Sequence, residues 1–495
     1  MKQRERPCAS CEKLRKQIGV LQENVDRLRD MVSKLADENA ALKAENQALR
    51  EKVSHLEERL NTNSSNSSKP PSSDPPDKKR RSSRPKNKSK RKRGAQPGHP
   101  DQQRKLYPED QVDKIVACIP EACEQCDRKL TDGIDPSPRR TQTAEIPPPK
   151  PMITEFQQHA RQCGDCGHTT VGRLPADADT RAFGPRVQAV VSLLSGAFRL
   201  SKREVKRIMG DVFCVEMSLG TVCNLQHATS QALEAPVEEA KAFVKSQPAV
   251  HLDETGWREA KSRSWLWTAV TTTVIVFLIR FSRGAKVARE LIGPHYRGIA
   301  HSDRWGAYSW IAPRKRQICW SHLIRDFQKL IDRGGIAAKI GKRLKKRANE
   351  MFGLWHRVRD GTLQRSTFNT YLSPIRQDIL ATLEAGTLCR NSKTARFCKN
   401  VLKLKSGLWT FARVEGVEPT NNAAERAVRK PVLWRKGSFG TDSAKGSRFV
   451  ERILSTVATL RAQQRNVLDY LVDACTAARR KEKAPSILPE SARDA

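Results

Sequence analysis

The sequence predicts a multidomain α/β protein, and three patterns along the chain carry that prediction. Residues 14–60 repeat apolar side chains every seven positions, as in a helix that pairs with another helix. Two CxxC pairs follow within residues 105–180, and residues 181–246 have helical periodicity. Residues 247–318 then read as strand, strand, strand, helix, strand, with a further short strand at the end. A chain of 495 residues has room for roughly three or four such domains.

The charge of the chain points to a polyanionic partner. Its formal net charge is +37 and its pI is close to 10.1, and lysine and arginine that bind phosphates release condensed counterions. A membrane surface is the competing polyanion, but no run reaches the ~20 apolar residues that span a bilayer, and the first ten residues lack the apolar core of a signal peptide. We therefore expect a nucleic-acid partner, no membrane, and 13 cysteines that serve as thiols or metal ligands.

Residues 14–60 contain uninterrupted heptads. One core position is leucine throughout, at Leu14, Leu21, Leu28, Leu35, Leu42, Leu49 and Leu56, and the other holds Ile18, Val25, Val32, Asn39, Asn46, Val53 and Leu60. This pattern predicts a parallel leucine-zipper coiled coil, in which the two asparagines fix the register. A single amphipathic helix packed on its own protein is the alternative, but it would not need seven aligned leucines. We expect a homodimer or a higher oligomer.

Two segments around the coiled coil have no predicted fold. The N-terminal arm, residues 1–13, has one CxxC pair (Cys8 and Cys11) with no second pair nearby, and it stays unassigned. Residues 61–104 form a linker rich in Ser, Asn and Pro, and eleven of the sixteen residues from Lys78 to Arg93 are basic. Such a run can be merely solvated, or it can lie along phosphates. The candidate DNA-binding residues are Lys78, Lys79, Arg80, Arg81, Arg91, Lys92 and Arg93.

The CxxC pairs of residues 105–180 predict a zinc-ribbon-like or treble-clef module. Its ligands would be Cys123, Cys126, Cys163 and Cys166, separated by a strand-forming interval at residues 153–159. Cys118 and His168 are spare candidates. Four thiolates leave no open coordination position, so the Zn²⁺ would be structural.

Residues 181–246 predict short helices. Ser201 and Ser218 are good N-caps for two of them, with a turn between. This arrangement suits a helix-turn-helix whose second helix enters a major groove, and an ordinary helical pair fits equally well.

Asp253 is the first candidate catalytic residue. Ala249, Val250 and Leu252 predict a buried strand that ends at Asp253, with Gly256 breaking the run. Further strands are predicted at residues 264–271, 273–281, 298–303 and 316–320, with a helix at 285–291. The fourth strand ends in Asp303. This order is that of a ribonuclease H-like fold, with acids ending strands one and four.

A third carboxylate is available from a later helix. Asn422 is a good N-cap that would put Glu425 in the first turn. The same pair also resembles a capping box, which is the purely structural alternative. Glu254 is a rival for Asp253, but alternation along a strand points it to the other face. Glu418 is a rival for Glu425, but it precedes Pro419 and should lie outside the helix.

These motifs together resemble the transposases of the insertion sequence 66 family, in the DDE superfamily. The resemblance spans nearly the whole chain and includes GAQPGHP, HLDETGW, HSDRWGAY, ICWSHL and PTNNAAERAVR. It implies Asp253, Asp303 and Glu425 as the catalytic triad of a domain at residues 247–460, with a helical insertion at about 321–418, followed by a C-terminal helix and tail at 461–495. Two departures are Arg304-Trp305, where the family often has a less bulky pair, and Lys430 before Pro431.

The resemblance implies a bacterial, cytoplasmic, nucleoid-associated enzyme that binds transposon ends, frees their 3′-hydroxyls and joins them to target DNA. Three acids suit two Mg²⁺ or Mn²⁺ ions that drive in-line transesterification. Arg426, Arg429, Arg435 and Lys436 could hold DNA phosphates. The competing hypothesis is a dimeric zinc-containing DNA-binding regulator, which leaves the three acids without a role. A catalytically dead relative is a third, and the presence of all three acids argues against it. Accessory proteins of the same element are possible partners.

Overall fold

The computed structural model of the chain describes residues 9–61, 105–130, 133 and 135–490. It is a mixed α/β protein with a helical N-terminus and a sheet-containing core, as predicted. The chain divides into two compact units. One comprises residues 1–84 and 322–402, and the other residues 85–321 and 403–495. Within the described ranges, every helix is too short or too polar to cross a membrane. The arm with Cys8, the side chain of Cys11 and the basic run at residues 78–93 lie outside the description.

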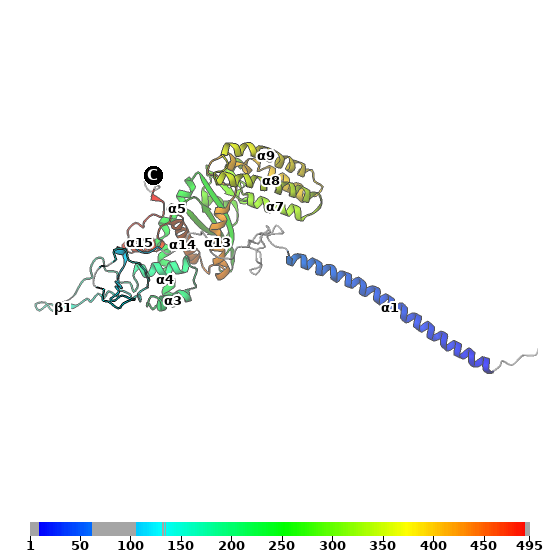
Figure 1. Cartoon of the computed structure of the whole chain (residues 1–495), viewed down its shortest axis with the longest axis horizontal. Coiled ribbons are helices and arrows are strands. Elements are labelled where there is room, and N and C mark those ends of the chain that lie inside the picture. The colour runs from blue at the N-terminus through cyan, green and yellow to red at the C-terminus, as the bar shows by residue number, and fades with distance from the viewer. Residues whose placement is uncertain (1–8, 62–104, 131–132, 134, 491–495) are drawn as a thin grey trace, which may run out of the picture. The chain divides into compact units, whose positions relative to one another are not determined.

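The heptad segment is one continuous helix, α1 (Ala9–Asn61), visible as the long rod in Figure 1. Its leucines are exposed in the single chain, between 50% and 61% from Leu14 to Leu56. Asn46 hydrogen-bonds the carbonyl of Leu42 within the same helix (3.2 Å). A long, largely apolar stripe of this kind is costly in water and is normally covered by another helix.

The other part of the first unit is helical. It contains most of α7 (Trp320–Asp332), then α8 (Gly335–Arg359), α9 (Arg365–Thr387) and α10 (Ser392–Leu402). Helices α8 and α9 pack on each other through the rings of Trp355 and Phe368, whose centroids are 5.5 Å apart. On their outer side Asp378 pairs with Arg343 and Arg347. The chain then continues through α11 (Lys405–Leu408) and α12 (Thr410–Arg413), which pack on the sheet of the second unit.

A five-stranded sheet is the centre of the second unit. Its strands are β3 (Ala249–Glu259), β4 (Ser262–Val270), β5 (Ile275–Arg280), β6 (Ile299–Ser302) and β7 (Arg316–Ile318). The spatial order is β5-β4-β3-β6-β7. The first three are antiparallel to one another, whereas β6 runs parallel to both β3 and β7. All five predicted strands are therefore present, with α6 (Ala285–Ile292) in the predicted place and the turns η3 (Gly306–Tyr308) and η4 (Pro313–Lys315) before β7.

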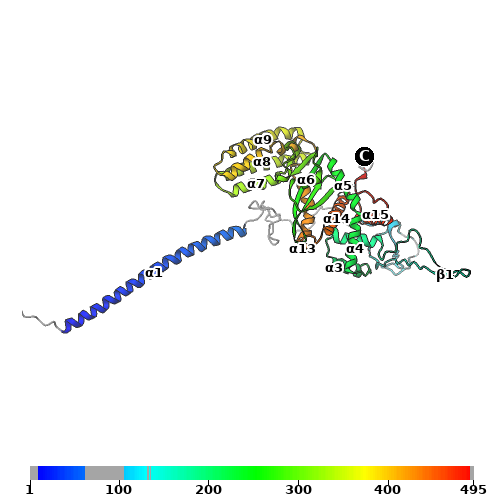
Figure 2. The same ribbon diagram turned by 180° about the vertical axis from the view of Figure 1, so that it is seen from behind.

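Helices cover both faces of this sheet (Figure 2). On one face Val250, Leu252 and Trp267 pack with α5 (Glu234–Ser246) and α6. On the other, Leu266 and Phe277 pack with Val450 and Leu454 of α14 (Ala444–Ala462), and α13 (Asn422–Ser438) lies along β3 and β4. Alternation along β3 therefore decides which side chains face α13 and which face α6.

Four shorter helices pack beside the sheet: α2 (Pro185–Gly196), α3 (Lys202–Asp211), α4 (Leu219–Ala232) and α15 (Val467–Arg480). The predicted N-caps are confirmed. Ser201 forms a full capping box with Glu204, and the hydroxyl of Ser218 accepts from the amide of Thr221 at 3.0 Å. Val205, Met209 and Val222 close a small core between α2, α3 and α4.

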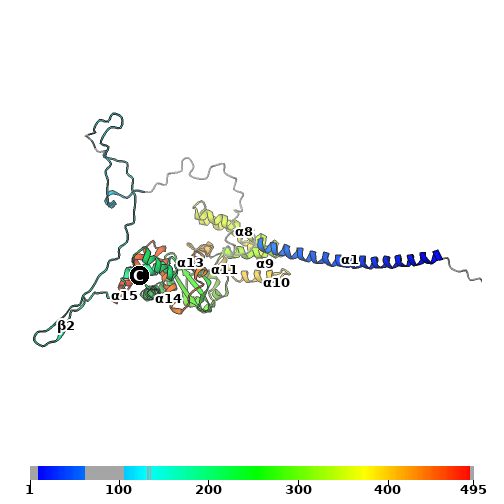
Figure 3. The same cartoon turned by 90° about the horizontal axis from the view of Figure 1, so that it is seen from below.

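The cysteine-rich segment has little regular structure. A turn η2 (Glu109–Gln111) precedes it, and a short hairpin of β1 (Ala160–Gln162) and β2 (Thr169–Val171) lies at the tip of two long extended segments, near the β2 label in Figure 3. The strand expected at residues 153–159 is absent; pairing begins only at Ala160, because the hairpin is set by the turn at residues 163–167.

Two local expectations around the acids were wrong. Gly256 does not break the first strand, since β3 continues through it to Glu259 and stays paired with β4. Asp253 is consequently in mid-strand. Asn422 is not the N-cap of α13 either, because that position belongs to Asn421. The backbone at Asn421 accepts the amide of Glu425 (3.2 Å), so Glu425 is in the first turn as predicted.

Asn421 caps no helix amide with its side chain; it anchors α13 to the sheet. The residue is 1% exposed. Its Nδ2 donates to the carbonyl of Leu252 at 2.6 Å, and its Oδ1 lies 3.1 Å from Nδ1 of His251. The amide of Asn421 also contacts Sγ of Cys319 (3.2 Å), directly after β7. The start of α13 is thereby tied to two strands.

The exposed stripe of α1 predicts self-association. A peptide of residues 14–60 should sediment as an oligomer at micromolar concentration, and replacing Asn39 and Asn46 by isoleucine should raise its melting temperature while loosening the choice of oligomeric state. A monomeric peptide in analytical ultracentrifugation would contradict the heptad assignment.

The anchor predicts different costs at two adjacent asparagines. Asn421→Ala should lower the free energy of unfolding by about 1–3 kcal/mol, because it leaves buried polar groups of β3 without their partner. Asn422→Ala is the matched control and should change stability by less than about 0.5 kcal/mol, because Asn422 is exposed. Chemical denaturation measures both, and equal costs would contradict the anchoring role.

Candidate active site

The three candidate acids come from three elements and converge on the α13 side of the sheet. Asp253 lies on β3 two residues beyond His251, where pairing with β6 ends. Asp303 follows directly after β6. Because His251 pairs with His301, continuing that parallel register by two places puts Asp303 beside Asp253. Glu425 reaches the same place from the first turn of α13, which begins against β3 at Asn421.

The charges of these acids repel each other. Burial, together with the nearby carboxylates of Glu254, Asp303 and Glu425, raises the pKa of Asp253 to about 8, against the hydrogen bond that its Oδ1 accepts from the amide of Glu254. That hydrogen bond is 2.9 Å long. The site therefore holds more negative charge than the protein compensates around Asp253, which is the environment that favours a bound cation.

A buried arginine of β7 holds the loop that carries Asp303. Arg316 of β7 is 2% exposed, and its Nη2 donates to the hydroxyl of Ser302 (3.0 Å) and to the carbonyl of Asp303 (2.8 Å). The carboxylate of Asp303 accepts the amide of Trp305 at 2.8 Å. Burial lowers the pKa of Arg316 to about 10, with Asp303 opposing the shift, so Arg316 stays charged at neutral pH.

Glu254 lies on the opposite face of β3, as strand alternation predicts. Its Oε1 accepts from Nε of Arg283 (3.0 Å), and its Oε2 accepts the hydroxyl of Tyr308. Arg283 is itself stacked against Trp305 and Trp265, at 4.0 and 4.7 Å from their ring centroids. Both carboxylate oxygens of Glu254 are thus engaged by the protein.

Two histidines lie behind the acids on the same face. The rings of His251 and His301 stack in parallel with centroids 3.8 Å apart. Burial lowers the pKa of His251 to about 4, against the hydrogen bond to Asn421 and helped by Arg426. Burial and His251 lower the pKa of His301 to about 3. Both rings are therefore neutral at physiological pH.

The basic residues of α13 have different environments. Arg426, Arg429 and Lys436 are exposed. Arg435 turns back onto β3, where its Nη1 donates to the hydroxyl of Thr255 (3.2 Å) and to the carbonyl of Gly256. A side chain on Gly256 would meet that guanidinium, since an added Cβ would lie 3.2 Å from Nη1. The geometry thus gives Arg435 a role in holding α13 on the sheet.

The two CxxC pairs each form the same turn. The amide of Asp127 donates to the carbonyl of Cys123 (2.9 Å), and that of Gly167 donates to the carbonyl of Cys163 (3.0 Å). Asp127 and Gly167 have positive φ, 53° and 71°. Backbone amides aimed at the first sulfur of each turn lower the pKa values of Cys123 and Cys163. In the described part of the chain, no three of the four sulfur atoms come within 4.8 Å of one another.

Several residues that shape the site are not evident from the order of residues alone. Asn421 and Asn422 both follow Thr420, and either could begin a helix. Tyr308 and Arg283 are far from Glu254 in sequence. His251 does carry a signal, since it precedes Asp253 by two positions on a strand and must share its face.

Comparison with known proteins places this chain among relatives. Residues 183–448 match the family described as Transposase IS66 family, and residues 10–105 match a Family of unknown function (DUF6444). An uncharacterized protein, y4hP, of Sinorhizobium fredii (strain NBRC 101917 / NGR234) is 24% identical over 412 residues, which is 75% of this chain and 73% of the relative. A second, y4qI of the same organism, is 25% identical over 245 residues, 43% of this chain and 44% of the relative.

Proposed function

Because the chain belongs to the IS66 family of transposases, we propose that it acts on DNA as a DDE transposase whose catalytic acids are Asp253, Asp303 and Glu425. It would bind the ends of its element, free their 3′-hydroxyls and join them to target DNA. The observation that carries the proposal is the convergence of three carboxylates from β3, the end of β6 and α13, where burial first, and then the charges of Glu254, Asp303 and Glu425, raise the pKa of Asp253 to about 8.

The donor set fits hard divalent cations. Carboxylate oxygens are the ligands that Mg²⁺ and Mn²⁺ prefer, and two such ions, when bound, would supply the Lewis acidity for in-line displacement at phosphorus. Glu254 is a poor rival because Arg283 and Tyr308 occupy both of its oxygens. Glu418 is a poor rival because it precedes α13. Asn421 and Arg316 position Glu425 and Asp303 through the backbone, which keeps the acids in place before any ion binds.

The sheet supports a ribonuclease H-like core. Three antiparallel strands followed by two parallel ones, in the order β5-β4-β3-β6-β7, correspond to the predicted succession of strands one to five. The acids follow the point where the parallel pairing of β3 and β6 ends, on the face of the sheet against which α13 packs. Ligands of α/β sheets commonly bind at such a carboxyl edge.

DNA contacts are assigned by charge and exposure. Arg426, Arg429 and Lys436 remain candidates for phosphate binding because their side chains are exposed on α13. The run from Lys78 to Arg93 remains a candidate on sequence alone. Helices α3 and α4, with their capped starts at Ser201 and Ser218, support the helix-turn-helix assignment, in which α4 would read the element's ends. Self-association through α1 would bring two copies of the site to two DNA ends.

A structural zinc ion is the fourth component of the proposal. The matching turns at Cys123 and Cys163 present amides to sulfur, which suits thiolate ligands. Binding one ion would require the two turns to meet, so zinc would also organise a segment that has little regular structure without it.

The competing regulator explains the coiled coil, the cysteines and the basic charge. It does not explain why three acids are brought together on the face covered by α13, at an electrostatic cost, beside exposed cations. The geometry therefore favours the enzyme.

The triad predicts loss of chemistry without loss of DNA binding. Asp253→Asn, Asp303→Asn and Glu425→Gln should each reduce 3′-end cleavage and strand transfer by at least roughly 10³-fold, an estimate from removing a charge that stabilises the transition state. Binding should persist in a gel-shift assay with EDTA. Glu418→Gln is the matched control and should retain substantial activity. Normal cleavage by all three triad variants would overturn the two-metal mechanism.

The cysteine turns predict bound zinc. The purified chain should contain one Zn²⁺ per protomer, and Cys163→Ser should lose it together with the protease resistance of residues 105–180, because binding and folding are coupled. Cys214→Ser, which changes an exposed cysteine elsewhere, is the control. Elemental analysis decides the matter, and an unchanged zinc content in Cys163→Ser would exclude the assignment.

A further inference from the structure

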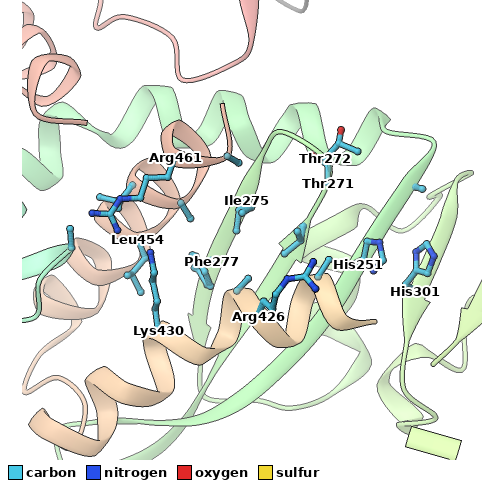
Figure 4. Close-up of a pocket in the computed structure, with 18 of the residues that line it drawn as sticks. His251, Thr271, Thr272, Ile275, Phe277, His301, Arg426, Lys430, Leu454 and Arg461 are labelled. Atoms are coloured by element: carbon cyan, nitrogen blue, oxygen red, sulfur yellow. The ribbon is translucent and has the colours of Figure 1, made fainter. Parts of the chain in front are cut away.

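A cleft of about 510 Å³ opens on the α13 face of the sheet (Figure 4), and none of the three acids lines it. Its floor is apolar and includes Ile275, Phe277, Leu454 and Val457, from β5 and α14. His251 and His301 line one end of the cleft, and each precedes an acid, Asp253 or Asp303, by two residues in the sequence. Since His251 and Asp253 are two residues apart on one strand, the cleft and Asp253 open on the same face of β3.

Four cations surround this floor. Arg426 and Lys430 come from successive turns of α13, Arg461 from the end of α14, and Arg199 from the segment after α2. The lining contains no aspartate or glutamate. Among the residues that the structure describes, none of the four has a carboxylate within ion-pair distance.

The charges in this cleft are mutually unfavourable as they stand. Burial lowers the pKa of Lys430, and the like charges of Arg461 and Arg199 lower it further. Holding several cations together over an apolar floor costs free energy unless an anion is bound between them. The combination of an apolar floor and a cationic rim selects a ligand with a flat, largely apolar body and a phosphate at its edge.

We propose that the cleft binds one unpaired nucleotide of the DNA strand being processed, with its base on the apolar floor and its phosphates on the cationic rim. This inference rests on the proposed function, in that the strand is the enzyme's DNA substrate. The volume is that of a site for one small molecule. A base that is still paired in a duplex cannot reach this floor, because the floor lies between residues of α13 and α14, and a nucleotide must leave the stack to enter such a pocket.

The position of the cleft next to the acids indicates what binding the nucleotide would do for the proposed reaction. A nucleotide held between β3, α13 and α14 would fix the adjoining phosphodiester at Asp253, since His251 and Asp253 share a face. Ala423 and Ala427 line the cleft on α13, and their small side chains leave room for the DNA strand between this helix and the sheet.

The test compares two DNAs that differ only at one end. The first is a blunt hairpin duplex. The second is the same duplex with a single unpaired nucleotide at that end, and the base of this nucleotide is the fluorescent analogue 2-aminopurine. Binding of the full chain is measured without added Mg²⁺ or Mn²⁺, so that metal ions bridging the acids and the DNA do not contribute while the proposed structural zinc is retained. The parent should prefer the DNA with the unpaired nucleotide by roughly tenfold, as expected of one or two charge-assisted contacts.

Matched double variants locate the preference. Lys430→Gln with Arg461→Gln should reduce the preference to within about twofold, and the slope of the salt dependence for the unpaired DNA should fall by about 0.7 for each phosphate that is no longer bound. The double variant Arg429→Gln with Lys436→Gln removes the same amount of charge outside the cleft. It should weaken the binding of both DNAs to the same extent. Ala462→Phe narrows the cleft without changing charge and should also remove the preference, with an unchanged melting temperature as the control for folding.

Each result separates the two proposals. Equal binding of both DNAs by the parent, or equal weakening of both by the cleft variants, would overturn the nucleotide site while leaving the transposase proposal intact. Failure of the parent to bind either DNA would instead contradict the proposed function itself.

Discussion

The mutual repulsion of three carboxylates is the constraint on which the second unit is built. An unassisted chain would keep Asp253, Asp303 and Glu425 apart, and their proximity contributes to raising the pKa of Asp253 to about 8, after burial. The protein resists this repulsion with anchors that act through the backbone. Parallel pairing of β3 with β6 aligns the two aspartates. Asn421 fixes the start of α13 through Leu252 and His251.

Two neighbouring acids of β3, one on each face of the strand, have different electrostatic surroundings. Glu254, on the α6 side, is neutralised by Arg283 and Tyr308 and supports the fold. Asp253, one residue earlier, has acids for neighbours and accepts a hydrogen bond from a backbone amide, on the face of β3 that α13 covers. An acid that supports the fold and the proposed catalytic acid are thus adjacent in sequence, and only their partners distinguish them. The cleft has the converse arrangement, with cations and no acids.

Outside the sheet, the parts of the chain are organised locally. Helix α1 follows from its heptads, the capped helices α3 and α4 follow from Ser201 and Ser218, and each CxxC turn is closed by its own backbone. Such parts need few long-range contacts, and two of them leave something unsatisfied in the single chain: an apolar stripe on α1 and free thiols in the CxxC turns. Those features are what a second chain and a metal ion would complete.

Residue order was sufficient to predict the strands and helices of the core, because apolar runs, turn residues and caps act over a few positions. It also predicted that Glu254 would face away from Asp253 and that Glu425 would lie in a first helical turn. It did not predict that β3 continues past Gly256, since the long ladder with β4 overrides the glycine. The choice of Asn421 over Asn422 was decided by burial against β3 and β7, which adjacent asparagines do not reveal. Arg435, one of several similar cations in sequence, is assigned to β3 only by its contacts. Local chemistry sets which elements form, whereas the partners of a charged or polar side chain come from elements that are distant in sequence, and so only the tertiary structure decides them.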